Sequence, residues 1–207
     1  SSPRSSATRN GNILVDTSAI IDRRISGISA AGFLQGTILI PRFVLDELRH
    51  VADSSDTMRR NRGRNVLEIL NQLSQENTVR TEMIDIKYES GMEVDAKLLE
   101  LAKGLHASIM TTDYNLNRVA QIEGILVLNV NELANSVKPV VLPGEDMRLM
   151  IVQEGKEVGQ GVGFLEDGTM VVVDSGSVYV NQDMGVVVTR VLQTVAGSII
   201  FAQPKRS

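Results

Sequence analysis

The sequence predicts an α/β domain with a parallel sheet, followed by a small all-β domain. In residues 13–138, short apolar runs alternate with helical patterns, which is typical of parallel strands joined by crossover helices. After VKPVVLPGED the pattern changes to β-branched runs separated by Gly, Asp and Asn, which favours a small antiparallel barrel. We therefore expect a polar linker at residues 1–11 and two domains, at residues 12–140 and 141–204.

The first domain is expected to contain five strands and six helices, with helices on both faces of the sheet. Short apolar runs predict strands at 13–17, 37–41, 79–85, 107–112 and 125–130. Apolar residues at helical spacing predict helices near 19–34, 42–53, 61–75, 93–104, 114–122 and 131–137.

Composition limits the classes of function. The 207 residues are 43% hydrophobic and 22% charged, the balance of a globular protein, and the absence of Cys excludes disulfides and thiolate metal sites. No apolar run approaches the roughly 20 residues that span a bilayer. The net charge of −4 argues against a generally basic nucleic-acid binder. The polar start SSPRSSATRN, which lacks an initiator Met, suggests a fragment of a longer chain.

Two aspartates directly follow buried strands. Asp16 ends the apolar run in GNILVDTSAI, and Asp113 follows the run in SIMTTDYNL. Ligands of open parallel sheets bind at the carboxyl ends of the strands. Asp16 and Asp113 come from adjacent strands if the strand order reverses between the first and the fourth. Each also precedes a helical pattern, so a helix N-cap is an equally good interpretation of either residue taken alone.

Two further acids lie at the flanks of apolar helix stripes. In VLDELRHVA, Glu47 borders the stripe, whereas Asp46 points toward solvent. In EVDAKLLELAKGL, Asp95 borders the stripe, and Glu93 lies further out. An acid at such a flank either faces the seam between helix and sheet or is simply solvated.

Convergence of these four acids would require a cation, because neighbouring carboxylates raise one another's pKa. Oxygen ligands favour a hard divalent ion, Mg²⁺ or Mn²⁺. Such an ion lowers the pKa of a bound water and stabilises negative charge on a phosphodiester. The sequence therefore predicts a hydrolytic metal site built from Asp16, Glu47, Asp95 and Asp113.

Several stretches match a known family. ILVDTSAIID, IPRFVLDELRHVADS, EVDAKLLELAKGLHASIMTTDYNLNRVA and VLNVNELANSVKPVVLPGE resemble a PIN-domain ribonuclease. GKEVGQGVGFLEDGTMVVVDSG and VVVTRVLQTVAGSIIFAQP are similar to a TRAM domain, and the combination resembles the bacterial YacL-like PIN–TRAM family. The resemblance implies a three-layer α/β/α domain with a parallel five-stranded sheet, followed by a small OB-like barrel.

The resemblance also implies a reaction, the endonucleolytic hydrolysis of single-stranded RNA by a metal-activated water, with no small-molecule cofactor. The acids that it carries over as catalytic residues and as ligands of Mg²⁺ or Mn²⁺ are Asp16, Glu47, Asp95 and Asp113. The polar residues that it places around them in support are Thr17, Ser18, Thr112 and Asn117, the last near a position where some members carry a further acid.

RNA contacts are expected from one basic cluster and one aromatic residue. Tyr114, beside Asp113, is placed to stack on a base. The basic cluster is a candidate phosphate grip or a merely solvated stretch, and it consists of Arg59, Arg60, Arg62 and Arg64. The TRAM resemblance suggests RNA binding by the second domain too. Residues 142–203 hold eight acidic and three basic side chains, however, so an RNA or protein contact module stays open there.

Further expectations follow from the family resemblance: a membrane-spanning segment before residue 1, a location on the cytoplasmic side of the cell membrane, and a homodimer. Receiver domains and nucleotide-binding folds are poor rivals, because their acidic pair, Lys and Gly-rich loops are missing. The alternative function is a membrane-tethered scaffold that binds RNA or a protein without catalysis.

Overall fold

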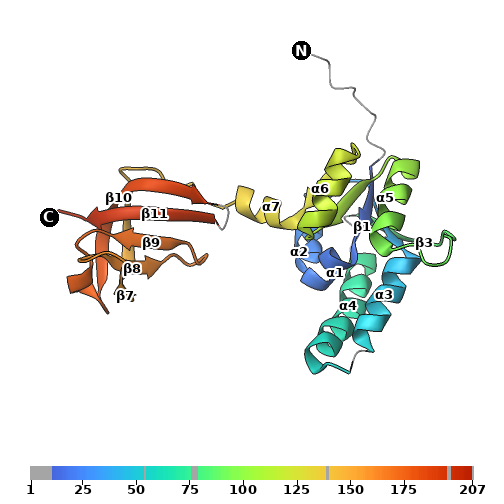
Figure 1. Ribbon diagram of the computed structural model, residues 1–207, viewed down its shortest axis with the longest axis horizontal. Coiled ribbons are helices and arrows are strands. Elements are labelled where there is room, and N and C mark those ends of the chain that lie inside the picture. Colours follow the sequence, from blue (N-terminus) through green and yellow to red (C-terminus); the bar gives the residue numbers. More distant parts are fainter. Residues whose placement is uncertain (1–10, 54, 76–78, 139, 195–196, 207) are drawn as a thin grey trace, which may run out of the picture. The chain divides into compact units, whose positions relative to one another are not determined.

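The computed structural model describes residues 11–53, 55–75, 79–138, 140–194 and 197–206, and of residues 58–60, 62–65 and 67 it describes the backbone alone. The chain divides into two compact units, Ser1–Ser136 and Val137–Ser207, which we call the N-terminal and C-terminal units. Figure 1 shows a sheet surrounded by helices in the first and a curled set of strands in the second. Each unit has its own hydrophobic core.

A parallel five-stranded sheet forms the centre of the N-terminal unit. Its strands are β1 Asn12–Val15, β2 Thr37–Pro41, β3 Arg80–Ile84, β4 Ser108–Thr111 and β5 Val127–Asn129. They pair in the order β3-β2-β1-β4-β5, and every pairing is parallel. The strand order reverses between β1 and β4, so Asp16 and Asp113 follow neighbouring strands. The fold class expected from the sequence is confirmed.

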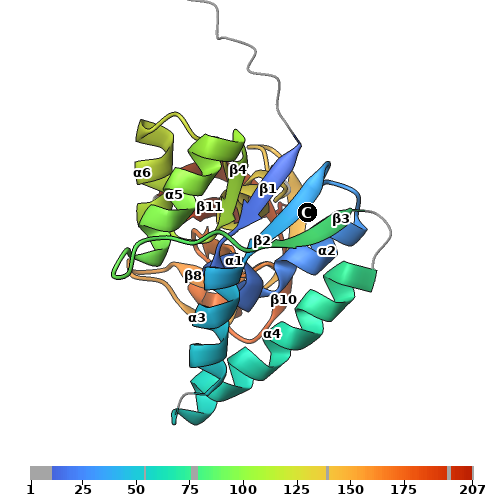
Figure 2. The same ribbon diagram turned by 90° about the vertical axis from the view of Figure 1, so that its right-hand side faces the viewer.

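Helices cover both faces of this sheet. They are α1 Thr17–Asp22, α2 Arg24–Ala30, α3 Arg42–Ala52, α4 Thr57–Gln75, α5 Val94–Leu105, α6 Tyr114–Ile122 and α7 Val130–Ser136. Right-handed crossovers place the helices before β3 on one face, and α5 and α6 on the other. Figure 2 shows α2 and α4 on the side of the sheet away from α5 and α6. Among the described residues, no helix is both long and apolar enough to cross a membrane.

The expectation of a single helix near residues 19–34 is wrong, because α1 ends at Asp22 and a separate helix, α2, begins at Arg24. Arg23 adopts a left-handed conformation with φ 75°, and its N–H donates to the carbonyl of Ile20 at 3.2 Å. A residue with positive φ cannot continue a right-handed helix. Ile20 and Ile25 on either side are both fully buried, so the apolar pattern runs through the break and hides it.

The core of the N-terminal unit explains why its central strands are apolar on both faces. Leu14 and Val15 of β1 and Ile109 of β4 are fully buried between the two helix layers. On α3, Val44 and Leu48 point into the same core. The carboxyl ends of β1 and β4 are therefore rigidly placed, and the residues that follow them inherit that placement.

A six-stranded curled sheet forms the C-terminal unit. Its strands are β6 Asp146–Met150, β7 Gln153–Glu154, β8 Gly161–Phe164, β9 Met170–Val173, β10 Asp183–Thr194 and β11 Gly197–Pro204, in the order β6-β10-β11-β9-β8-β7. A short 3₁₀ helix, Ser177–Tyr179, precedes β10. The expectation of a purely antiparallel barrel needs correction, because β9 and β11 pair in parallel. After β9 the chain crosses to begin β10 beside β6, so the returning β11 runs in the direction of β9.

Candidate active site

Asp16 lies at the carboxyl end of β1, where its main-chain N–H donates to the carbonyl of Met110 on β4 at 2.9 Å. The residue is 5% exposed. It occupies the N-cap position of α1, yet its carboxylate makes no cap hydrogen bond. Its Oδ2 instead accepts hydrogen bonds from Ser18 Oγ at 2.5 Å and Thr111 Oγ1 at 2.8 Å. The N-cap interpretation therefore does not account for a carboxylate at this position.

Thr111 supports Asp16 through its side chain, a role for which the sequence analysis named its neighbour Thr112. The Thr111 side chain is fully buried, donates to Asp16, and accepts the main-chain N–H of Asp113 at 2.9 Å. Thr112 contributes through its main chain, whose N–H donates to Ser18 Oγ at 3.0 Å. The pairing of β1 with β4 decides which of the two threonines faces Asp16.

Asp113 does act as a helix N-cap. Its Oδ1 accepts hydrogen bonds from the N–H groups of Asn115 at 2.7 Å and Leu116 at 3.0 Å, at the start of α6. The side chain is exposed, and its second oxygen takes no hydrogen bond from a described residue. Capping and ligand binding are compatible here, because each uses a different oxygen.

Glu47 reaches the site from α3. Thr17, the residue after Asp16, donates from Oγ1 to Glu47 Oε2 at 2.5 Å. Glu47 is half-buried, whereas the neighbouring Asp46 is exposed. Thr17 and Ser18 thus contact two different acids, Glu47 and Asp16, and link α3 to the end of β1.

Asp95 on α5 completes the acidic group. Its pKa is raised above the usual aspartate value, first by desolvation and then by the negative charges of Asp16, Asp113 and Glu47. Glu93 adds a smaller contribution of the same sign. The four acids, drawn from residues 16 to 113 of the chain, therefore share one electrostatic environment.

The acids do not enclose a metal site by themselves, as far as the described residues show. Among the described residues, no three Asp, Glu, His or Cys side chains approach closely enough to enclose a metal ion by themselves. Mg²⁺ usually keeps several waters and binds through one or two carboxylates together with substrate phosphates. The all-oxygen donor set and the electrostatic strain at Asp95 therefore fit a hydrated divalent cation.

A second polar group lies beside the acids, at the ends of α6 and β5. Asn117 is 3% exposed, its Nδ2 lies 3.4 Å from Glu132 Oε1, and its Oδ1 has no hydrogen-bond partner among the described residues. Asn129 accepts the main-chain N–H groups of Asn131 and Glu132 and so begins α7. The sequence analysis named Asn117 but missed Glu132 and Asn129, for which the only signal was the three polar residues of NVNE after an apolar strand.

Of the residues expected to contact RNA, the structure describes the side chain of Tyr114 but not those of the basic cluster. Tyr114 is 65% exposed at the start of α6, and Arg118 Cζ lies 5.8 Å from its ring centroid. The basic cluster falls on α4, but its side chains lie outside what the structure describes: Arg59, Arg60, Arg62 and Arg64.

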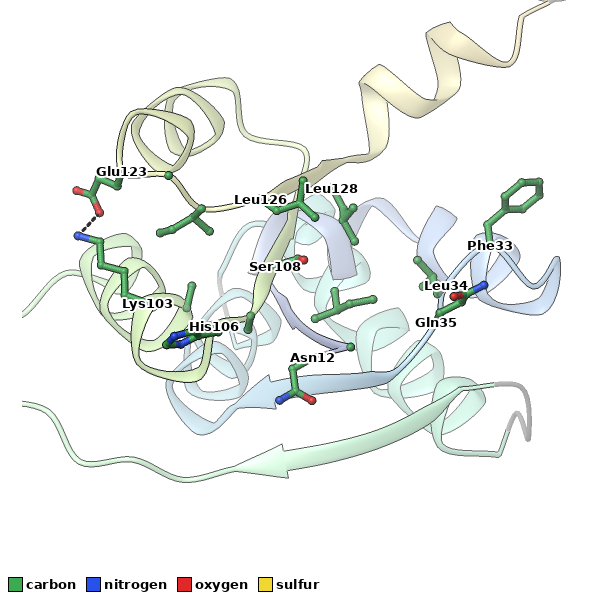
Figure 3. A pocket seen from close by; sticks show the side chains of 16 residues that line it. Asn12, Phe33, Leu34, Gln35, Lys103, His106, Ser108, Glu123, Leu126 and Leu128 are labelled. Atoms are coloured by element: carbon green, nitrogen blue, oxygen red, sulfur yellow. Dashed lines mark ion pairs between the residues drawn. The ribbon is translucent and has the colours of Figure 1, made fainter. Parts of the chain in front are cut away.

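A pocket of about 650 Å³ opens at the amino ends of the central strands, by the first residues of β1 and β4 (Figure 3). Asn12, His106 and Ser108 line it, as do Lys103 and Glu123, which form an ion pair of 2.7 Å. None of the four acids lines this pocket. We place the candidate active site at the acids nevertheless, because hydrolysis requires convergent titratable groups more than an enclosed volume.

The chain is similar to known proteins over most of its length. The chain is 52% identical over 192 residues to the PIN and TRAM-domain containing protein YacL of Bacillus subtilis, covering 93% of this chain and 52% of that protein. It is 47% identical over 191 residues to the PIN and TRAM-domain containing protein slr1972 of Synechocystis, covering 92% of this chain and 53% of that protein. The chain therefore spans about half the length of these relatives.

A solved structure shows the same fold. A domain of a functionally unknown protein from Methanocaldococcus jannaschii superposes with a TM-score of 0.50 and 24% identity, covering 65% of this chain and 96% of that one. The family model described as PIN domain matches residues 13–122, which contain all four acids. Because this match covers more than half of the sequence, the chain belongs to the PIN domain family, a family of nucleases.

Proposed function

We propose that the N-terminal unit is a Mg²⁺- or Mn²⁺-dependent endoribonuclease that hydrolyses the phosphodiester bonds of single-stranded RNA. The observation that carries the proposal is the placement of the acids at the carboxyl ends of β1 and β4, where buried Asp16 accepts from Ser18 and Thr111, and Thr111 also accepts the N–H of Asp113. The pKa of Asp95, raised by desolvation and then by the charges of the other three acids, agrees with this grouping. Carboxylates that repel one another destabilise a fold, so their grouping favours a function that uses a cation.

The surrounding contacts suggest a role for each acid. Asp16 is buried and held by two hydroxyl donors, which orients it as a rigid metal ligand. Asp95 and Asp113 are more exposed and supply oxygens on the solvent side. Glu47, oriented by the hydrogen bond from Thr17, would complete the ion's shell or orient the attacking water. A divalent ion held by these residues would supply an activated water and would stabilise the charge that develops on the phosphodiester.

Cleavage of a labelled single-stranded RNA, with Mg²⁺, with Mn²⁺ and with EDTA, tests the proposal. Asp16→Asn removes a ligand charge with little change in shape, and we expect it to lower the rate by about 100-fold or more. Asp46→Asn is the matched control, because Asp46 is exposed beside Glu47 and pairs only weakly with Arg42 at 4.0 Å. We expect its rate to equal that of the wild type.

Two results would count against the nuclease. Equal rates for the wild type and Asp16→Asn would show that the cleavage does not come from this site. Metal binding by calorimetry without cleavage would favour the non-catalytic scaffold, in which the acids hold an ion but RNA is only bound.

A further inference from the structure

The basic side chain of Arg24 is connected by hydrogen bonds to residues around the acidic site. Arg24, the first residue of α2, donates from Nε to Asp22 Oδ1 at 2.5 Å and from Nη2 to Asp22 Oδ2 at 2.8 Å. Nη2 also donates to Asn131 Oδ1 at 2.6 Å. The guanidinium is therefore held along one edge by side chains from α1 and α7.

Asn131 connects this guanidinium to the acids. Its Nδ2 lies 3.5 Å from the carbonyl oxygen of Thr112, whose N–H donates to Ser18 Oγ at 3.0 Å. Ser18 in turn donates to Asp16 at 2.5 Å. A continuous series of polar contacts thus runs from Arg24 to the most buried acid of the site.

The other edge of the guanidinium makes no hydrogen bond to a residue that the structure describes. The Arg24 side chain is 42% exposed, and its Nη1 donates to no described residue. Asp22 is the less exposed partner, at 23%. Two N–H donors of Nη1 are therefore available to a ligand while the Nε–Nη2 edge stays anchored.

The backbone explains why Arg24 takes this position. Arg23 has φ 75°, an unfavourable conformation for a residue with a Cβ, and it separates α1 from α2. This break lets Asp22 and Arg24, on either side of it, pair with each other. Strained backbone persists where the surrounding contacts hold it, and it often accompanies a functional position.

We propose that Arg24 binds a phosphate of the RNA strand next to the one that is cleaved. The proposal rests on the proposed function, because its ligand is the RNA of that site. A polyanion that approaches four carboxylates is repelled, so its neighbouring phosphates need a cation at the edge of the site. An anchored guanidinium with a free pair of donors suits a phosphate oxygen better than a mobile ammonium does.

The test measures binding of a fluorescein-labelled oligouridylate by anisotropy over a range of salt concentrations. All variants carry Asp16→Asn and the buffer contains Mg²⁺, so that the RNA is bound and not cut. We expect Arg24→Ala to raise Kd by about 3- to 10-fold and to reduce the slope of log Kd against log salt by about 0.7. Arg24→Lys should restore part of the affinity and most of the slope.

Two further variants make the result specific. Asp22→Asn keeps Arg24 but removes the charge that competes with phosphate, so we expect Kd to fall by about 2- to 3-fold. Arg80→Ala is the control, because Arg80 forms a comparable exposed ion pair with Glu82, 2.6 Å apart, on the edge strand β3. Its Kd and salt slope should match those of the parent.

An unchanged Kd and salt slope in Arg24→Ala would overturn the proposal. The role of Arg24 would then be only to link α2 to α7 through its hydrogen bond to Asn131. If Arg24→Ala unfolds, as circular dichroism would reveal, Asp22→Asn decides: tighter binding supports the phosphate contact, and unchanged binding overturns it. Failure of the nuclease itself is a separate result, namely wild-type protein that does not cleave RNA with either metal.

Discussion

Asp95 is repelled by the other acids of the site. Its pKa is raised by desolvation and then by the negative charges of three other acids. Without metal, this repulsion opposes folding. We expect Asp95→Asn to raise the free energy of unfolding in EDTA by about 0.5–1 kcal/mol, a value reduced by solvent screening of this exposed group. Urea titration measures it, with Glu100→Gln on the same helix as the control.

The same raised pKa predicts a dependence on pH. The folded state holds the Asp95 proton more tightly than the unfolded state does, so the contribution of Asp95 to the free energy of unfolding falls as pH rises through the aspartate range. Asp95→Asn lacks this fall. The stability advantage of the variant in EDTA should therefore widen as pH rises through the ordinary aspartate pKa and level off above the raised pKa of Asp95. An advantage that stays constant over this range would contradict the assigned cause.

Thr111 is the residue that we expect to support Asp16 most directly. Thr111→Val keeps the shape but removes the donor to Asp16 and the acceptor of the Asp113 N–H. We expect a loss of about 1–3 kcal/mol in stability and a 10- to 100-fold weaker affinity for Mn²⁺ by calorimetry. Thr112→Val is the matched control, since Thr112 contacts the site through its main chain. Equal effects of the two variants would refute this distinction.

At the level of elements, the break between α1 and α2 carries local strain. Arg23→Gly should relieve the cost of a positive φ and, after the greater entropy of Gly in the unfolded chain, raise the free energy of unfolding by about 0.5 kcal/mol. Arg23→Ala removes the same side chain but keeps the Cβ, so it should give no gain. A gain of equal size in both variants would point to the charge of Arg23 as the cause.

In the C-terminal unit, β8 lies very close to the main chain of the segment before the 3₁₀ helix. A Cβ at Gly161 would lie 2.7 Å from main-chain atoms of Gly176 and 2.8 Å from Ile151 Cγ2. We expect Gly161→Ala to destabilise this unit by about 1–3 kcal/mol in calorimetry. Gly185→Ala on β10, whose Cβ would come no closer than 3.7 Å to Lys205, should leave the transition nearly unchanged.

At the level of the whole molecule, two units with separate cores should unfold separately. A chain that ends at Ser136 should keep the unfolding transition of the N-terminal unit and its Mn²⁺ affinity, because all four acids lie within that unit. Differential scanning calorimetry of the full chain and the truncated chain compares the two. Loss of a cooperative transition on truncation would show that the N-terminal unit needs the C-terminal one for its stability.

The sequence by itself determined the parallel sheet and the four acids. Strands and helices of the N-terminal unit follow from local periodicity, and Asp16 and Asp113 are recognisable because a carboxylate directly after a buried strand is unusual. Glu47 could be separated from Asp46 because helix geometry alone decides which of them borders the apolar stripe. These signals are local, so one chain suffices to read them.

Thr17 and Ser18 were expected beside the acids, but only the tertiary structure decided which polar residues from distant parts of the chain support them. Thr111 rather than Thr112 faces Asp16 because of the register between β1 and β4, and Glu132 meets Asn117 because α7 begins beside α6. The parallel pairing of β9 with β11 likewise depends on contacts between distant parts of the chain. A hydrogen bond between residues nearly a hundred positions apart leaves no periodic trace in the sequence, since nothing local fixes either partner.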